Sequence, residues 1–292
     1  MTVETGSTVP RRQAGRLMRQ LRERAGMSLM AAAVELEFSR ARMYRIENGE
    51  VSLRKHDVLA MCSVYGAPDE IAEVLVGLAR ESKSKGWWHA YGDVVPGWFE
   101  LYVGMETAAE RLRHYAPSVI PGLLQNREYA ESVFRRRTDL DEAGVRNAVA
   151  VRLERQSLLR RVSPAPPRLD VIVDEGVLHR TIADTLGMQK QLAHLVNISQ
   201  RPGVNVRVVP FSAGPHRASS AGSFTILDFP TLTAAAPEPT TIYCENLTGA
   251  LYLDKPHEVE TYGGIWSELE QVALDRRASD DLIGTIIKES DG

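Results

Sequence analysis

The sequence lacks the features that would place it in a membrane or in an oxidising compartment. No apolar run approaches the ~20 residues that a membrane-spanning helix needs. The first residues, MTVETGSTVPRR, have no apolar core of a secretion signal, so we expect a cytoplasmic protein. Only two cysteines occur among 292 residues, Cys62 and Cys244, and their separation matches no metal-ligand spacing. We therefore expect free thiols, no disulfide and no metal site.

The motifs of common enzyme classes are missing too. There is no Walker loop, no Gly-x-Ser-x-Gly elbow and no Gly-x-Gly-x-x-Gly after a strand. None of the seven histidines has the i, i+4 histidine and the carboxylate partner of a zinc protease. Asp174-Glu175 and Glu245 beside Cys244 offer a conceivable catalytic pair, but acidic residues at strand ends more often cap helices or face solvent. We expect no enzyme, no catalytic residue and no cofactor.

Charge is present in both signs but is unevenly distributed. The whole chain has a formal net charge of −3. Residues 1–55 contain ten arginines and one lysine against six glutamates, so this segment has a charge of +5 and the remainder −8. A basic N-terminal segment, here called the head, followed by an acidic remainder, here called the body, is typical of a protein in which only the head contacts nucleic acid. A solvated arginine-rich face on a small helical domain would give the same count.

Residues 1–84 predict a small domain made only of helices. A first helix opens at Val9-Pro10-Arg11, and its apolar residues recur every four positions up to Gly26. Ser28 and Ser39 are good N-caps for two short helices over 28–36 and 40–48. Two further helices are expected near 55–65 and 69–83.

The second and third of these helices have the pattern of a helix-turn-helix. Such a motif needs a small residue where the helices cross, and Ala33 provides it. It needs apolar residues beneath the second helix, and Met43 and Ile46 are correctly spaced. It also needs polar residues on the outer face, which are Arg40, Arg42, Tyr44 and Arg45. The pattern predicts that the helix over 40–48 enters the major groove of DNA.

The segment GMSLMAAAVELEFSRARMYRIENGE resembles the Cro/C1-type (XRE) helix-turn-helix family. The resemblance implies that base edges are read by Arg40, Ala41, Tyr44 and Arg45. It implies that Ser39, Arg42 and Asn48 lie near phosphates, and that Arg22 and Glu47 form a structural ion pair. The sequence departs from the family at two positions, since Glu37 replaces the usual turn glycine and Leu29 replaces a glutamine. A left-handed backbone at Glu37 would cost about 1 kcal/mol.

Residues 85–292 predict an α/β or α+β domain, so the fold class is an all-α head followed by a mixed body. Helices are expected at 97–110, 126–137, 141–161, 184–200, 256–276 and 279–289. Strands are expected at 168–175, 204–211, 222–229, 241–246 and 249–254, with a loop over 212–222. No internal repeat is present.

The body contains one group of large apolar residues whose role the sequence leaves open. They lie in an aromatic-rich stretch and in a Pro-Gly turn: Trp87, Trp88, Trp98, Ile120, Leu123 and Leu124. Hydrophobic residues of this size leave water, so they belong either to the core or a domain interface, or to a ligand pocket or partner surface. Of these, core or interface is the more frequent outcome.

Several short motifs extend the resemblance over nearly the whole chain. They are Trp87-Trp88, Pro121-Gly122-Leu123-Leu124-Gln125 with Tyr129-Ala130, Arg152-x-x-Arg155-Gln156, Asp174-Glu175-x-x-Leu178, Gln191-Leu192-x-x-Leu195, Val209-Pro210-Phe211-x-x-Gly214 and Tyr243-x-Glu245. The chain thus resembles the WhiJ-like XRE regulators of actinobacteria, which have a C-terminal domain of unknown function. This implies transcriptional control, often beside a gene for a small partner protein.

The main expectation and two alternative hypotheses follow. The first is a DNA-binding regulator that acts as a homodimer, because one recognition helix covers too few base pairs to select a genomic site. The second is an antitoxin-like protein that sequesters a small partner protein. The third, an enzyme tethered to DNA, would require turnover of a small molecule.

Overall fold

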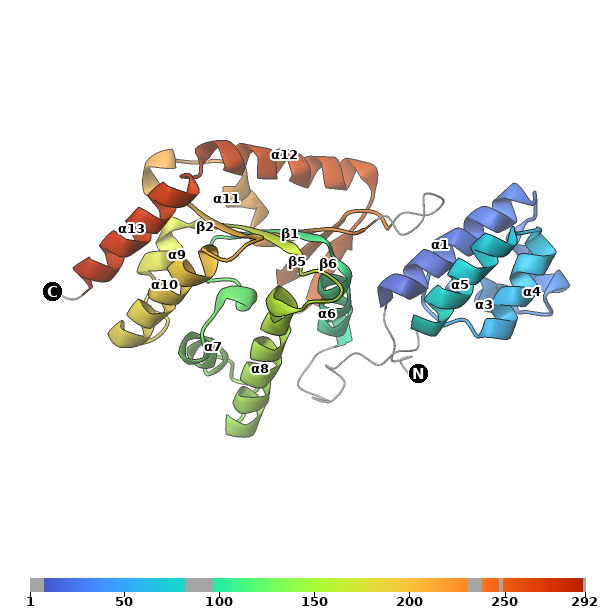
Figure 1. Ribbon diagram of the computed structural model, residues 1–292, viewed down its shortest axis with the longest axis horizontal. Coiled ribbons are helices and arrows are strands. Elements are labelled where there is room, and N and C mark those ends of the chain that lie inside the picture. The colour runs from blue at the N-terminus through green and yellow to red at the C-terminus, as the bar shows by residue number, and fades with distance from the viewer. Residues whose placement is uncertain (1–7, 82–96, 231–237, 247–248, 291–292) are drawn as a thin grey trace. The chain divides into compact units, whose positions relative to one another are not determined.

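The computed structural model describes residues 8–81, 97–230, 238–246 and 249–290. These residues belong to two compact units (Figure 1). The first unit comprises Met1–Ala90 with Phe229–Glu238, and the second comprises Tyr91–Asp228 with Pro239–Gly292. The expected domain boundary at residues 84 and 85 lies outside the described residues. No helix among the described residues has the length and apolar content needed to cross a membrane.

The described part of the first unit contains five helices around one core. They are α1 (Thr8–Arg24), α2 (Leu29–Glu35), α3 (Arg40–Glu47), α4 (Lys55–Tyr65) and α5 (Asp69–Glu81). Leu17 and Met18 of α1 pack in one buried cluster with Met43 of α3, Met61 of α4 and Leu75 of α5. Removal of this apolar surface from water holds the five short helices together, since helices of this length are marginal alone.

The second unit is built on a six-stranded mixed sheet with the order β3-β2-β1-β4-β5-β6. The strands are β1 (Arg111–Ala116), β2 (Arg168–Asp174), β3 (Val204–Val209), β4 (Phe224–Asp228), β5 (Thr241–Asn246) and β6 (Gly249–Leu253). The pairs β1–β2 and β2–β3 are parallel, whereas β4, β5 and β6 follow as antiparallel neighbours. The mixed sheet confirms the expected α+β class.

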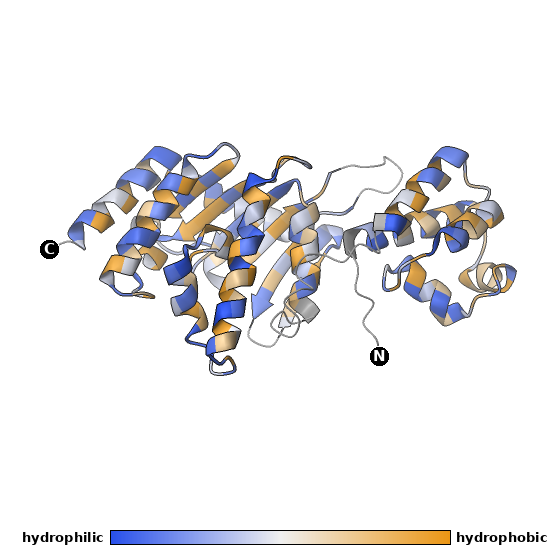
Figure 2. Cartoon of the chain, turned by 60° about the horizontal axis from the view of Figure 1, so that its bottom comes forward, coloured by the Kyte–Doolittle hydropathy of each residue, from blue (hydrophilic) through white to orange (hydrophobic). Residues whose placement is uncertain are grey.

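Helices lie on both sides of this sheet (Figure 1). They are α6 (Gly97–Ala108), α7 (Arg127–Phe134), α8 (Glu142–Arg155), α9 (Glu175–His179), α10 (Thr185–Ser199), α11 (Ala218–Ala221), α12 (Pro256–Val272) and α13 (Arg276–Glu289). Trp266 and Leu269 of α12 pack on Tyr115, Ile172 and Phe224 from three strands. In Figure 2 the apolar residues concentrate on the strands and on helix stripes, as an enclosed sheet requires.

Three elements of the body were not expected from the sequence. The central strand β1 has the polar sequence RLRHYA and follows directly on a predicted helix, so the pattern did not show it. The helix α11 lies inside the predicted loop over 212–222, and α9 continues directly from β2. The predicted helix over 141–161 ends at Arg155 and continues as a 3₁₀ turn, Gln156–Arg160.

Candidate DNA-binding interface

Serine side chains define where α2 and α3 begin. Ser28 Oγ accepts a hydrogen bond from the backbone N–H of Ala31 at 3.1 Å, and Ser39 Oγ accepts one from Arg42 at 3.1 Å. Each bond satisfies one of the amides that a helix leaves unpaired in its first turn. Ser39, which the resemblance placed near the phosphates, therefore has a structural role as the N-cap of the recognition helix.

The turn between α2 and α3 contains a strained residue. Glu37 has φ of 55° and is the non-glycine residue with a left-handed backbone in the described part of the chain. The conformation is the one expected at the position that the family resemblance assigns to glycine. A side chain in this region costs about 1 to 2 kcal/mol relative to the right-handed region.

Glu37→Gly is therefore expected to stabilise the protein, by about 1 kcal/mol or less once the extra freedom of glycine in the unfolded chain is deducted. The measurement is the urea midpoint of the full chain. Glu73→Gly, at an exposed position inside α5, is the control and should destabilise by about 0.5–1 kcal/mol. Equal losses for both variants would show that Glu37 carries no strain.

One face of α3 is exposed and cationic. Arg40, Ala41, Tyr44 and Arg45 are all exposed, whereas Met43 is fully buried. In the described residues, neither Arg40 nor Arg45 has an ion-pair partner, so both guanidinium groups are available to a ligand. Five N–H donors in a planar fork suit a guanine edge or a phosphate.

Arg42 differs from these two arginines because its guanidinium is already occupied. Its Nη2 atom lies 2.9 Å from Oδ2 of buried Asp57 in α4, and its guanidinium carbon lies 3.8 Å from the centre of the Phe38 ring. The Asp57 carboxylate also accepts the backbone N–H of Arg54 at 3.3 Å. Asp57, to which the sequence analysis gave no role, thus ties α3 to the start of α4. The expected phosphate contact of Arg42 stays a prediction.

Arg22 and Glu47 form a buried bidentate ion pair between α1 and α3. The Nε–Oε1 distance is 2.6 Å and the Nη2–Oε2 distance is 2.8 Å, and Nη1 of Arg22 donates to the carbonyl of Met27 at 2.8 Å. Hydrogen bonding to Glu47 raises the pKa of Arg22 above its ordinary value. The pair fixes the C-terminal end of the recognition helix from behind, and its carboxylate faces away from solvent.

Gly15 of α1 allows this close contact, and the sequence analysis missed it. A β-carbon at Gly15 would lie 2.4 Å from the carbonyl oxygen of Ile46 and 2.8 Å from that of Glu47. The last carbonyls of α3 therefore pack directly on the backbone of α1. A glycine inside a helix is a usable signal, because it costs helix stability unless close packing requires it.

Gly15→Ala is expected to destabilise the full chain by about 1–2 kcal/mol, since overpacking costs ~1–3 kcal/mol and alanine returns up to ~1 kcal/mol of helix propensity. Gly77→Ala in α5 is the matched control, because no atom lies within 4 Å of a β-carbon there. That control should stabilise the chain in the same thermal unfolding experiment. A stabilised Gly15→Ala variant would contradict the close packing of α1 on α3.

For the six apolar residues of the body whose role the sequence left open, the structure assigns three to the core, the more frequent of the two alternatives. Ile120, Leu123 and Leu124 are buried, with at most 5% of their surface exposed. Trp87 and Trp88 lie outside the described residues, and Trp98 lies in α6 without a described side chain. The apolar turn can lie in the core because side chains form hydrogen bonds with its backbone N–H and carbonyl groups.

Glutamine and tyrosine side chains hold that turn. Gln125 Nε2 donates to the carbonyl of Ile120 at 2.6 Å, and Tyr129 Oη accepts the N–H of Ile120 at 3.3 Å. Gln156 donates to the carbonyl of Gln125 at 2.6 Å, and Gln191 of α10 donates to that of Leu124 at 2.8 Å. Several of the motifs that extend the resemblance through the body are therefore architectural.

The conceivable acidic pair has structural partners instead. Asp174 caps α9 through the N–H of Gly176 at 3.1 Å, Glu175 accepts the N–H of Phe211 at 2.6 Å, and Glu245 accepts the hydroxyl of Tyr243 at 2.9 Å. Strands β2 and β5 are separated in the sheet by β1 and β4. No group of three His, Cys, Asp or Glu in the described ranges is arranged to hold a metal ion.

Comparisons with protein families agree with this division of the chain. Residues 13–75 match a helix-turn-helix domain, which supports DNA binding by the first unit. Residues 99–285 match a domain of unknown function, DUF5753. Comparisons with curated proteins and with solved structures found no match. Since the second match covers more than half of the sequence, the chain belongs to the DUF5753 family and has a helix-turn-helix domain in front of that domain.

Proposed function

We propose that this protein is a sequence-specific transcriptional regulator of the WhiJ-like XRE type that reads the major groove with α3. The observation that carries the proposal is the exposed face of α3, where Arg40 and Arg45 have no protein partner in the described residues. Behind that face, the Arg22–Glu47 pair holds the helix at a defined angle. An unpaired cationic face on a rigidly held helix suits direct readout of base edges.

The acidic body supports a regulatory role rather than a second DNA contact. Most of the negative charge of the chain lies outside residues 1–55, and it opposes approach of the body to phosphates. We propose that the body is not an enzyme. The acidic pair that the sequence offered supports this proposal, because Asp174 caps a helix and Glu175 binds a backbone amide.

The experiment that tests DNA reading is selection from a random DNA library with the full chain. The expected result is an enriched motif with a steep dependence of affinity on salt. Recovery of unenriched DNA with the same salt dependence would mean that the head binds only the backbone.

Assembly gives a further expected result. Leu17, Met18 and Met43 are buried within the head, so we expect the body to provide the dimer contacts. Light scattering of the full chain should give twice the chain mass, and the selected motif should be an inverted repeat with half-sites about one DNA turn, ~34–36 Å, apart. A monomer that tightly binds an inverted repeat would contradict this.

The antitoxin-like alternative predicts a different composition of the purified protein. Exposed apolar side chains on the body, among them Phe211 at 63% and Leu186 at 59%, are available to a small protein. A stoichiometric small protein that co-purifies from the native host, together with no enriched DNA motif, would favour sequestration over gene regulation.

A further inference from the structure

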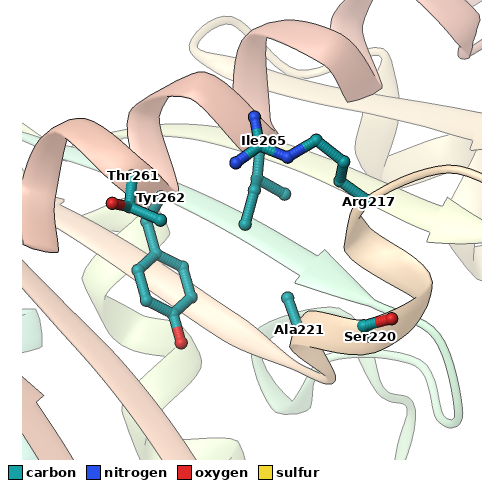
Figure 3. Close-up of a pocket in the computed structure, with 6 residues that line it drawn as sticks. All are labelled: Arg217, Ser220, Ala221, Thr261, Tyr262 and Ile265. Carbon is teal, nitrogen blue, oxygen red and sulfur yellow. The ribbon is translucent and has the colours of Figure 1, made fainter.

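A pocket of about 370 Å³ lies between α11 and α12 in the second unit (Figure 3). It is lined by Arg217, Ser220, Ala221, Thr261, Tyr262 and Ile265. A polar rim is formed by the exposed residues Arg217, Ser220 and Thr261. Ile265 is buried and forms part of an apolar floor. The volume is at the lower end of the range for small-molecule sites, ~300–1,000 Å³.

The cation at the rim, the Arg217 guanidinium, forms no ion pair within 4 Å among the described residues. The Glu268 carboxylate is bound instead to the backbone N–H of Arg217 at 3.2 Å. A β-carbon built on Gly264 would lie 3.7 Å from Nη1 of Arg217. The guanidinium therefore extends over α12 at a position without a side chain, next to Ile265 (Figure 3).

Two glycines shape the wall that holds Arg217 in this position. Gly214 has φ 67° and ψ −160°, and Gly222 has φ 68° and ψ −164°. Residues with side chains essentially do not adopt these angles. Between these two glycines, α11 packs against α12.

Two of the other polar side chains in the pocket take part in hydrogen bonds within the protein. Thr261 donates to the carbonyl of His257 at 2.7 Å, and the Tyr262 hydroxyl is paired with Cys244 Sγ at 3.3 Å. The Ser220 hydroxyl makes no hydrogen bond in the described residues. The Tyr262 oxygen accepts the bond from Cys244, and the Arg217 guanidinium is the cationic group that a ligand can reach beside the apolar floor.

We propose that this pocket binds a small carboxylate with an apolar body. The carboxylate pairs with Arg217, which offers two parallel N–H donors to its two oxygens. The apolar body lies on Ile265, Ala221 and the ring of Tyr262. A neutral molecule of the same shape keeps the apolar contacts but leaves the arginine without a counter-charge.

The test uses the full chain without DNA, titrated with benzoate and hexanoate and with their neutral counterparts, benzyl alcohol and 1-hexanol. Binding is followed by ligand-observed NMR. We expect saturable binding of at least one carboxylate, with a Kd at least tenfold lower than that of its alcohol. Arg217→Gln should raise the carboxylate Kd at least tenfold and leave that of the alcohol unchanged. Arg146→Gln, at an exposed position on α8, is the charge-matched control and should change neither.

Three results would overturn the proposal: no saturable binding of either carboxylate, equal Kd values for acid and alcohol, or equal effects of Arg217→Gln and Arg146→Gln. Both substitutions are at exposed positions, so folding should be retained, and circular dichroism checks this. Because DNA is absent, carboxylate binding by a chain that selects no DNA motif would refute only the proposed DNA reading.

Discussion

Glu47→Ala is expected to lower the free energy of unfolding of the full chain by about 3 kcal/mol. Removing one partner of a buried ion pair typically costs ~3–5 kcal/mol, because the other charge stays buried without compensation. The lower end of this range applies here because two other interactions of Arg22 remain. Its guanidinium still donates to the Met27 carbonyl at 2.8 Å and lies 3.6 Å from the Glu23 carboxylate. In this variant α3 also loses its only described bidentate connection to α1.

Thermal and urea unfolding of the full chain measure this loss. Glu50→Ala, at an exposed position just past α3, is the matched control and should stay within about 0.5 kcal/mol of the parent. The double variant Arg22→Met with Glu47→Leu should be more stable than either single variant, because no unpaired charge is left. If Glu47→Ala weakens DNA binding but unfolds at the parent temperature, Glu47 is a DNA contact and not a structural residue.

Arg45→Ala is expected to weaken binding to the selected DNA site by about 1–3 kcal/mol, which is roughly a 5- to 150-fold rise in Kd. The reason is its exposed guanidinium on the outer face of α3, without a partner in the described residues. Base preference at one position of each half-site should relax. Competition binding against random DNA at fixed salt measures both effects.

Two arginines serve as comparisons for that result. Arg24→Ala removes an equal charge from the exposed last turn of α1 and should change specific and random binding alike and only slightly. Arg42→Ala should weaken binding to all sequences similarly and flatten the salt dependence, and it should also reduce stability because buried Asp57 loses its cation. If Arg45→Ala weakens binding to specific and to random DNA equally, Arg45 does not read a base.

The helical head was predictable because its determinants are local. Ser28 and Ser39 are close in sequence to the amides that they cap, and the spacing of Met43 and Ile46 decides which face of α3 is buried. The start and end of α4 agree with the expected range of 55–65. The left-handed turn at Glu37 was predicted through the family resemblance, which assigns a glycine to that position.

The partners of charged groups could not be predicted in the same way, except where a family resemblance supplied them. Asp57 holds Arg42 from 15 positions away, and nothing in the spacing of the two residues indicates the contact. The same limit applies to Gly15, whose neighbours are the carbonyls of a helix about thirty residues further on. Such contacts depend on the angle at which two helices cross, which the periodicity of either helix leaves undetermined.

The central strand β1 shows most clearly what only the tertiary structure decided. Its sequence RLRHYA has neither a clean alternation nor a run of β-branched residues, so local propensity does not favour a strand. In the sheet, Arg111 pairs with Asp170 at 2.8 Å and Arg113 with Asp228 at 3.0 Å, while His114 is hydrogen-bonded to Thr225 at 3.1 Å. Burial lowers the pKa of His114 to about 4, so the ring is neutral inside the sheet.

The sequence by itself therefore determined the helical head, the exposed arginine face and most strands of the body, because caps, turns and apolar spacing act over a few residues. The tertiary structure decided that β1 lies at the centre of the sheet and that Ile120, Leu123 and Leu124 are core rather than surface. It also decided that Arg217 lines a pocket and has no ion-pair partner among the described residues. For β1 and for the turn at Ile120, the outcome depends on groups distant in sequence that satisfy a buried charge or a backbone amide.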